Sequence, residues 1–65
     1  LAYYRRIFAE APPLLRDGAD VVLEVGDAQA DAVLELGRRA GFLPLGIRQD
    51  LAGTPRAVLL RWEQL

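Results

Sequence analysis

Three charged residues stand where this chain could do chemistry: Glu24, Asp50 and Arg56. Glu24 is a carboxylate within the otherwise apolar stretch Val21–Val25, and ionisable groups in such surroundings often have the shifted pKa values that functional sites use. Asp50 and Arg56 bracket a turn-rich segment, residues 50–55. Ligands of open α/β sheets bind beyond the carboxyl ends of the parallel strands, so Glu24, near the end of its strand, is a candidate for the rim of a binding site.

A structural role for the same residues is the hypothesis we favour. An unpaired buried carboxylate is costly, and the start of the last strand should lie beside the end of Val21–Val25, so Glu24 is expected to pair with Arg56. Replacing Glu24 with Gln would then destabilise the fold more than it alters binding. Asp50 is expected to hold its turn, through backbone N–H groups or by facing Arg56.

The strand that carries Glu24 is the element around which the chain is organised. Val21–Val25 is a nearly continuous apolar run, typical of a buried strand that is covered on both faces. Gly26-Asp27 after it is typical of a strand-to-helix corner, with the aspartate as the helix N-cap.

A helix should run from Asp27 to about residue 40, where Gly41 would supply a left-handed cap. The opposite, solvated face should be charged, and Glu35 can reach Arg38-Arg39 one turn on. The apolar face is expected to consist of Ala28, Ala32, Val33, Leu36 and Ala40.

An amphipathic helix over Leu1–Ala11 should precede the strand. Its expected apolar face consists of Tyr4, Ile7, Phe8 and Ala11. Pro12-Pro13 should end it, because proline lacks an N–H donor and disfavours helical geometry in the residue before it. Leu14 and Leu15 are then expected to pack, and Asp17-Gly18 to turn the chain into the strand.

Two more strands should follow the second helix. Phe42–Gln49 alternates like a strand with one buried face, but Pro44 cannot donate to a central ladder, so this strand belongs at a sheet edge. Ala57–Trp62 is apolar enough to lie in the interior of a sheet. The predicted order is helix, strand, helix, strand, strand, an α/β arrangement within one partial domain, residues 1–65.

Composition narrows the class of protein. Of the 65 residues, 52 % are hydrophobic and 26 % charged, as in folded domains. The net charge is −1 and the arginines are scattered, so nothing indicates nucleic-acid binding. No apolar run is long enough to span a membrane and no signal-peptide core is found, so the cytoplasm is the expected location.

A core this small usually needs a disulfide, a metal or a partner. The chain contains no Cys and no His, which excludes disulfides and the common zinc sites. A partner, or a missing remainder of the same domain, is therefore expected. The sequence begins with Leu1 and contains no Met, from which we expect an excerpt or a processed chain.

Two strings of residues stand out by their order and spacing. The first is Leu23-Glu24-Val25-Gly26 with Gln29 beyond it, and the second is Asp50-Leu51-Ala52-Gly53-Thr54-Pro55-Arg56. Together they resemble the C-terminal end of the HemK-type glutamine methyltransferases that modify peptide chain release factors. The opening Leu1-Ala2-Tyr3-Tyr4-Arg5-Arg6-Ile7 is similar to the segment that follows the catalytic loop of those enzymes. The resemblance covers nearly the whole chain, and the Asp-Leu-x-Gly-x-x-Arg string is its most specific part.

The resemblance implies a class I methyltransferase fold, a Rossmann-like and mostly parallel sheet flanked by helices, with an antiparallel last strand inserted beside the fifth. On that map Val21–Val25 is the fifth strand, Phe42–Gln49 the sixth at the edge, and Ala57–Trp62 the seventh between them. The resemblance also implies transfer of a methyl group from S-adenosylmethionine to the glutamine amide of a Gly-Gly-Gln loop in a release factor.

The motifs that carry this activity in the family are absent from the chain. The family holds its cofactor on a glycine-rich loop and the glutamine amide on an Asn-Pro-Pro-Tyr motif, but this sequence has no Asn and no Gly-x-Gly. No catalytic, cofactor-binding or metal-binding residue is therefore carried over. We expect a non-catalytic fragment, inactive by itself, in which Glu24, Asp50 and Arg56 form at most the acceptor-side rim.

Other hypotheses stay open. Related glutamine methyltransferases act on proteins other than release factors, and DNA adenine methyltransferases use a similar Asn-Pro-Pro-Tyr site. A free-standing binding or dimerisation module, one half of a ferredoxin-like fold, begins with the same strand order but would need a further helix and strand after Trp62. On either hypothesis Val21–Val25 exposes an apolar edge, so the isolated chain is expected to self-associate, by edge pairing or by swapping the first helix.

Overall fold

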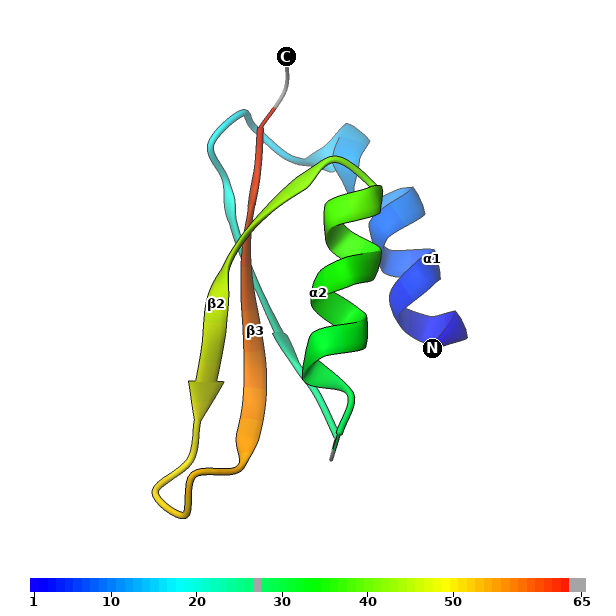
Figure 1. The fold of residues 1–65 in the computed structure, drawn as a ribbon. Coiled ribbons are helices and arrows are strands. Elements are labelled where there is room, and N and C mark those ends of the chain that lie inside the picture. The colour runs from blue at the N-terminus through cyan, green and yellow to red at the C-terminus, as the bar shows by residue number, and fades with distance from the viewer. Residues whose placement is uncertain (27, 64–65) are drawn as a thin grey trace.

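A three-stranded antiparallel sheet carries both helices of the chain on one of its two faces (Figure 1). The computed structural model describes residues 1–26 and 28–63. The elements are, in chain order, α1 (Ala2–Glu10), the 3-10 helix η1 (Pro12–Leu14), β1 (Asp20–Glu24), α2 (Ala30–Arg39), β2 (Phe42–Gln49) and β3 (Pro55–Trp62). The predicted order helix, strand, helix, strand, strand is confirmed, and η1 begins where Pro12 ends α1.

The last strand lies in the middle of the sheet, as predicted. The strand order is β1-β3-β2, and β3 runs antiparallel to both neighbours. The register places Leu60 opposite Val21 on β1 and opposite Pro44 on β2. Since Leu60 directs its own N–H and C=O groups to β1, the nitrogen of Pro44 points away from β3. The missing N–H therefore faces the open edge, which confirms that β2 is an edge strand.

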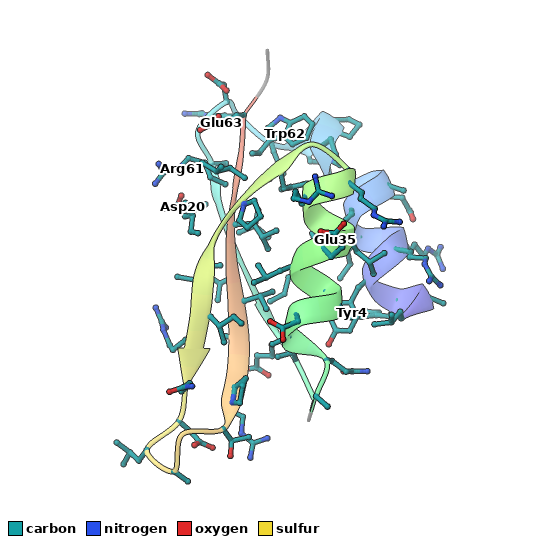
Figure 2. The ribbon with its side chains drawn as sticks, viewed as in Figure 1. Tyr4, Asp20, Glu35, Arg61, Trp62 and Glu63 are labelled. Atoms are coloured by element: carbon teal, nitrogen blue, oxygen red, sulfur yellow. The ribbon has the colours of Figure 1, made fainter. Side chains whose placement is uncertain are left out.

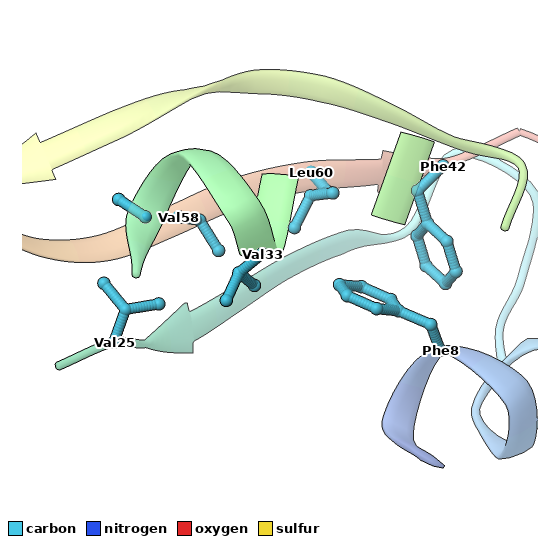
Figure 3. Packing of buried hydrophobic residues seen from close by; sticks show 7 residues of the cluster. Phe8, Val25, Val33, Phe42, Val58 and Leu60 are labelled. Atoms are coloured by element: carbon cyan, nitrogen blue, oxygen red, sulfur yellow. The ribbon is translucent and has the colours of Figure 1, made fainter. Parts of the chain in front are cut away.

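The core lies between the sheet and the helices. Phe42 on β2 contacts Phe8 on α1, with ring centroids 5.2 Å apart, and Trp62 on β3, at 4.9 Å. Val33, Val58 and Leu60 are fully buried between α2 and β3, as Figure 3 shows. A layer of aliphatic side chains under α2 thus continues into an aromatic cluster under α1.

Gly37 allows α2 to approach β3 closely. It is a buried residue in the helix interior, where glycine is normally unfavourable. A Cβ atom at this position would overlap Cδ2 of Leu60 and would lie 3.0 Å from Cζ of Phe8. The absence of a side chain is therefore what lets Leu60 and Phe8 meet under the helix.

The buried face of α2 differs from the predicted one. Val33 is buried and Leu36 half-buried, as expected, but Ala28, Ala32 and Ala40 are exposed. The helix begins at Ala30, with Gln29 as N-cap, and its buried stripe is Ala30, Val33 and Gly37. The predicted N-cap, Asp27, lies outside the described residues. Gly41 has the expected left-handed conformation after the helix, with φ +99°.

The prediction that β1 is covered on both faces is wrong for this chain. Val21 and Leu23 point toward the helices and are half-buried, whereas Val22 between them is 54 % exposed. Both helices lie on one side of the sheet, so the other face is bare (Figure 1). The expected packing of Leu14 is also wrong, because this side chain is 85 % exposed, but Leu15 packs against the core as predicted.

Candidate functional site

The loop between β2 and β3 is held by the side chain of Asp50. Its Oδ1 accepts hydrogen bonds from the backbone N–H groups of Ala52, at 2.9 Å, and Thr54, at 3.0 Å. Its Oδ2 accepts from Nε of Arg56 at 2.9 Å. Both routes predicted for Asp50, backbone N–H groups and Arg56, are therefore found together.

These bonds also set the ionisation of Asp50. The N–H of Thr54 lowers the pKa of this carboxyl below its ordinary value, and Arg56 lowers it further. Asp50 is thus held as a carboxylate. Its hydrogen bonds to the backbone N–H groups of Ala52 and Thr54 keep the loop in a tight turn. The loop presents Leu51 at its tip, where this side chain is fully exposed.

Glu24 ends β1 as an exposed residue, and the predicted ion pair with Arg56 is wrong. Among residues 1–26 and 28–63 its carboxylate forms no ion pair, and Arg56 binds Asp50 instead. The register gives the reason: Glu24 lies opposite Ala57, and directly opposed residues share a face of the sheet. Arg56, one residue earlier, points to the other face. The basis for expecting Glu24→Gln to destabilise the fold is therefore removed.

The backbone of Glu24, rather than its carboxylate, makes the structural contact. The Tyr4 hydroxyl on α1 donates a hydrogen bond of 2.8 Å to the Glu24 carbonyl oxygen. Figure 2 shows Tyr4 reaching from the first helix toward the lower end of the sheet. This contact ties α1 to the end of β1, twenty residues away in the sequence.

The three predicted rim residues share one end of the sheet but are not one cluster. Asp50 and Arg56 are joined directly, while Glu24 lies on the face without helices. Arg48 joins Glu24 there, because both residues lie opposite Ala57 from the two outer strands. Sequence reasoning did not select Arg48, since only the register of β2 against β3 places it on that face.

Other ion pairs lie away from this end of the sheet. Asp20 on β1 binds Arg61 on β3 at 3.0 Å, and further pairs lie on α2. Glu35 binds Arg38 at 2.7 Å and Arg39 at 2.9 Å, as the helical spacing predicted. Hydrogen bonds from Arg38 and then from Arg39 lower the pKa of Glu35 to about 2. These exposed pairs lie along one turn of α2 and belong to its solvated face.

The described residues enclose several shallow hollows. A hollow of about 320 Å³ lies against α1 and η1 and is lined by Tyr3, Arg6, Ile7, Glu10, Ala11 and Leu14. Within the described ranges no cluster of His, Cys, Asp or Glu could hold a metal ion. The helices found there are too short and too polar to cross a membrane.

Comparison with known proteins gives a consistent set of relatives. No protein-family model matches the chain. It is 33 % identical over 61 residues to a release factor glutamine methyltransferase of Thermodesulfovibrio yellowstonii, a match that covers 94 % of the chain and 22 % of that protein. It is 41 % identical over 58 residues to the protein of the same name from Cereibacter sphaeroides, covering 89 % and 21 %.

A solved structure is similar over almost the whole chain. It is the crystal structure of a release factor-specific protein-(glutamine-N5) methyltransferase from Alicyclobacillus acidocaldarius, with a TM-score of 0.75 and 40 % sequence identity. The match covers 98 % of this chain and 41 % of that one. The chain thus spans about a fifth of the length of the curated relatives it matches.

Proposed function

The chain is homologous to release factor glutamine methyltransferases over about a fifth of their length, and on that premise we propose that residues 1–65 form the C-terminal, non-catalytic part of the catalytic domain of such an enzyme. The observation that carries this proposal is the structural similarity, with 40 % identity and a TM-score of 0.75 over 98 % of the chain. The same match covers less than half of the related structure, in keeping with a part of a larger domain.

The activity we propose for the parent protein is methylation of a peptide chain release factor. A methyl group would pass from S-adenosylmethionine to the side-chain amide nitrogen of the glutamine in a Gly-Gly-Gln loop. The groups that bind the cofactor and hold the amide would lie in the part of the parent outside this chain.

The described residues do not fit S-adenosylmethionine. The cofactor's ribose needs a free carboxylate and its binding turn needs closely spaced glycines. In the hollow against α1 and η1, Glu10 is bound by Arg6 at 2.9 Å, and that hollow is otherwise mostly apolar. No Gly-x-Gly occurs anywhere in the sequence. These residues would therefore take no part in the chemical step.

The part we assign to this chain is to complete the sheet and to form the acceptor-side rim. Asp50 and Arg56 hold the β2–β3 loop in one shape, and Glu24 lies at the same end of the sheet. A loop that is ordered before binding loses little entropy when a protein docks on it. Leu51, fully exposed at its tip, would then contact the protein acceptor.

The strand arrangement supports a Rossmann-like sheet in the parent protein. Strand order β1-β3-β2, with β3 antiparallel to both, matches the fifth, seventh and sixth strands of the class I methyltransferase sheet described above. The outer edge of β1 is where the parallel strands of such a sheet would continue. Release factors act on ribosomes, so the parent would work in the cytoplasm.

The coding DNA upstream of the Leu1 codon tests this proposal. We expect its translation to contain an apolar strand followed by Asn-Pro-Pro-Tyr, with a glycine-rich loop further upstream. A start codon directly before Leu1, or an unrelated domain there, would contradict the proposal. The free-standing ferredoxin-like module, which begins with the same order of strands, would then be the better hypothesis.

A further inference from the structure

Tyr4 joins the beginning of α1 to the end of β1. Its hydroxyl donates a hydrogen bond of 2.8 Å to the carbonyl oxygen of Glu24, the last residue of β1. Tyr4 stands in the first turn of α1, which begins at Ala2. The carbonyl of Leu1 accepts from the N–H of Arg5 at 3.0 Å, so the chain enters the helix directly at that turn. The first turn of α1 therefore lies at the carboxyl end of β1 (Figure 2).

The carbonyl that Tyr4 binds is one that β3 does not use. The N–H of Val25 donates to the carbonyl of Arg56 at 2.9 Å, which makes these two residues a hydrogen-bonded pair of the ladder. Such pairs alternate along antiparallel strands, so the N–H and C=O groups of Glu24 point away from β3. A strand that joined the outer edge of β1 would thus meet a carbonyl that is already bound at the level of Glu24.

Two side chains one turn apart hold α1 to the rest of the chain. Phe8 is buried and its ring lies 5.2 Å from that of Phe42, so it fixes the second half of the helix in the aromatic cluster. Tyr4 comes four residues earlier, on the same face of the helix, and is half-buried against the core. Without its hydroxyl bond, α1 would keep the Phe8 anchor but its first turn would be free to swing about that point. The hydroxyl of Tyr4 thus sets the direction of the helix axis.

We propose that Tyr4 is a positioning residue for the segment that precedes α1 in the parent protein. This inference rests on the proposed function, in which β1 is one strand of a larger, mostly parallel sheet. Ligands of such sheets bind beyond the carboxyl ends of the parallel strands, and Tyr4 directs the chain before Ala2 to that end. The rim residues Glu24, Asp50 and Arg56 lie at the same end.

The proposed function places the groups that hold the glutamine amide outside this chain. A segment that enters α1 at its first turn would bring such groups against the rim. Tyr4 acts on them through α1 and does not itself touch the reacting atoms. Loss of its hydroxyl should therefore misplace the preceding segment while leaving the rim residues as they are.

Steady-state kinetics of the longer product of the coding sequence test the proposal, with a purified release factor and S-adenosylmethionine as substrates. Tyr4→Phe should lower kcat about tenfold, because a small displacement of reacting groups is costly in rate. The KM for the release factor should stay unchanged, since the rim that would bind it is intact.

Tyr3 provides a matched control. Its ring lies 5.3 Å from that of Tyr4, edge to face, but its side chain is 71 % exposed. Tyr3→Phe removes a hydroxyl from the neighbouring residue and leaves the bond between Tyr4 and Glu24 in place. We expect this variant to change neither kcat nor KM.

Leu60→Val separates positioning from a general loss of stability. It removes one methylene group from a fully buried side chain under α2 and should destabilise the fold. Leu60 lies opposite Val21, near the start of β1 and away from Glu24. At a temperature where all variants are folded, kcat should be unchanged in Leu60→Val and lowered in Tyr4→Phe.

Hydrogen exchange of the longer product gives a second readout, which does not need activity. Tyr4→Phe should accelerate exchange in the residues directly before Leu1 and in the first turn of α1. The amides around Phe8 should keep their protection, because that anchor is untouched. Tyr3→Phe should show the exchange pattern of the wild type.

The outcomes distinguish this inference from the proposed function. An inactive wild-type longer product would contradict the proposed function, and hydrogen exchange would then decide the role of Tyr4. A kcat in Tyr4→Phe that is lowered no more than in Tyr3→Phe or Leu60→Val would overturn the inference. A raised KM with an unchanged kcat would overturn it too, as would exchange before Leu1 that Tyr4→Phe does not alter.

Discussion

Replacing Gly37 with alanine would change the free energy of unfolding in two opposite ways, and the structure indicates which of them is larger. In an exposed helix the change would stabilise by up to about 1 kcal/mol, because glycine is the poorer helix former. Here the new Cβ would overlap Cδ2 of Leu60 and approach the Phe8 ring to 3.0 Å at Cζ and 3.1 Å at Cε1. Leu60 is fully buried and Phe8 nearly so, and neither has solvent to move into.

The packing cost should exceed the gain in helix propensity. Added methyl groups in a filled core cost about 1–3 kcal/mol. The overlap with Leu60 places Gly37→Ala in the upper part of that range, so the net loss should be about 1–2 kcal/mol. For a chain of this size each kcal/mol lowers Tm by roughly 4–8 °C. Thermal unfolding followed by circular dichroism, at one low protein concentration, measures the shift.

Two further variants separate the packing cost from the gain in helix propensity. Ala32→Gly, at an exposed position of the same helix, reports the propensity term alone and should cost about 1 kcal/mol. Leu60→Val should be better tolerated in the Gly37→Ala background than in the wild type, because it makes room for the new methyl group. If Gly37→Ala raised Tm, α2 would not lie as close to β3 as described, and the reasoning would be refuted.

The other predictions concern single polar contacts. Tyr4→Phe removes the hydrogen bond to the last carbonyl of β1 and should cost about 0.5–1.5 kcal/mol in urea unfolding; an unchanged midpoint would mean that the bond is not made. Arg38 and then Arg39 depress the pKa of Glu35 from 4.5 to about 2, so its stabilising contribution is complete above about pH 4.5 and is lost as the pH falls toward 2. The unfolding midpoint of Glu35→Gln should therefore fall less than that of the wild type over this window, and parallel pH profiles would count against the pairing. Asp50→Asn keeps an acceptor for the loop amides while Asp50→Ala does not, so hydrogen exchange in the loop should accelerate more in the alanine variant; equal rates would show that Asp50 does not hold the loop.

Sequence reasoning located the elements because each carries a local signal. The helical spacing of Ile7 and Phe8 and the Pro12-Pro13 pair set the bounds of α1 to within one residue. Pro44 identified an edge strand from its missing N–H alone. The apolar composition of Ala57–Trp62 indicated an interior strand, and the family resemblance added which two strands it lies between.

The wrong predictions have a common physical cause. Each of them concerned the face of the sheet or of the helix to which a side chain points. Glu24 and Arg56 lie near each other along the sheet, but the register places their side chains on opposite faces. Register depends on how two strands pair, so neither strand shows it when considered alone. The buried face of α2 includes Gly37, which has no side chain and is therefore missed when apolar side chains are used to find the buried face. Val22 was expected to be covered because its run is apolar, yet the described chain has helices on only one face of the sheet.

The role we propose for this chain is that of a non-catalytic part of a release factor glutamine methyltransferase. The most direct test is the mass of a purified peptide chain release factor after incubation with S-adenosylmethionine and either the 65-residue chain or the longer product of its coding sequence. We expect one added methyl group, on the glutamine of the Gly-Gly-Gln loop, with the longer product and none with the 65-residue chain. Methylation by the chain alone, or no methylation by the longer product, would contradict it.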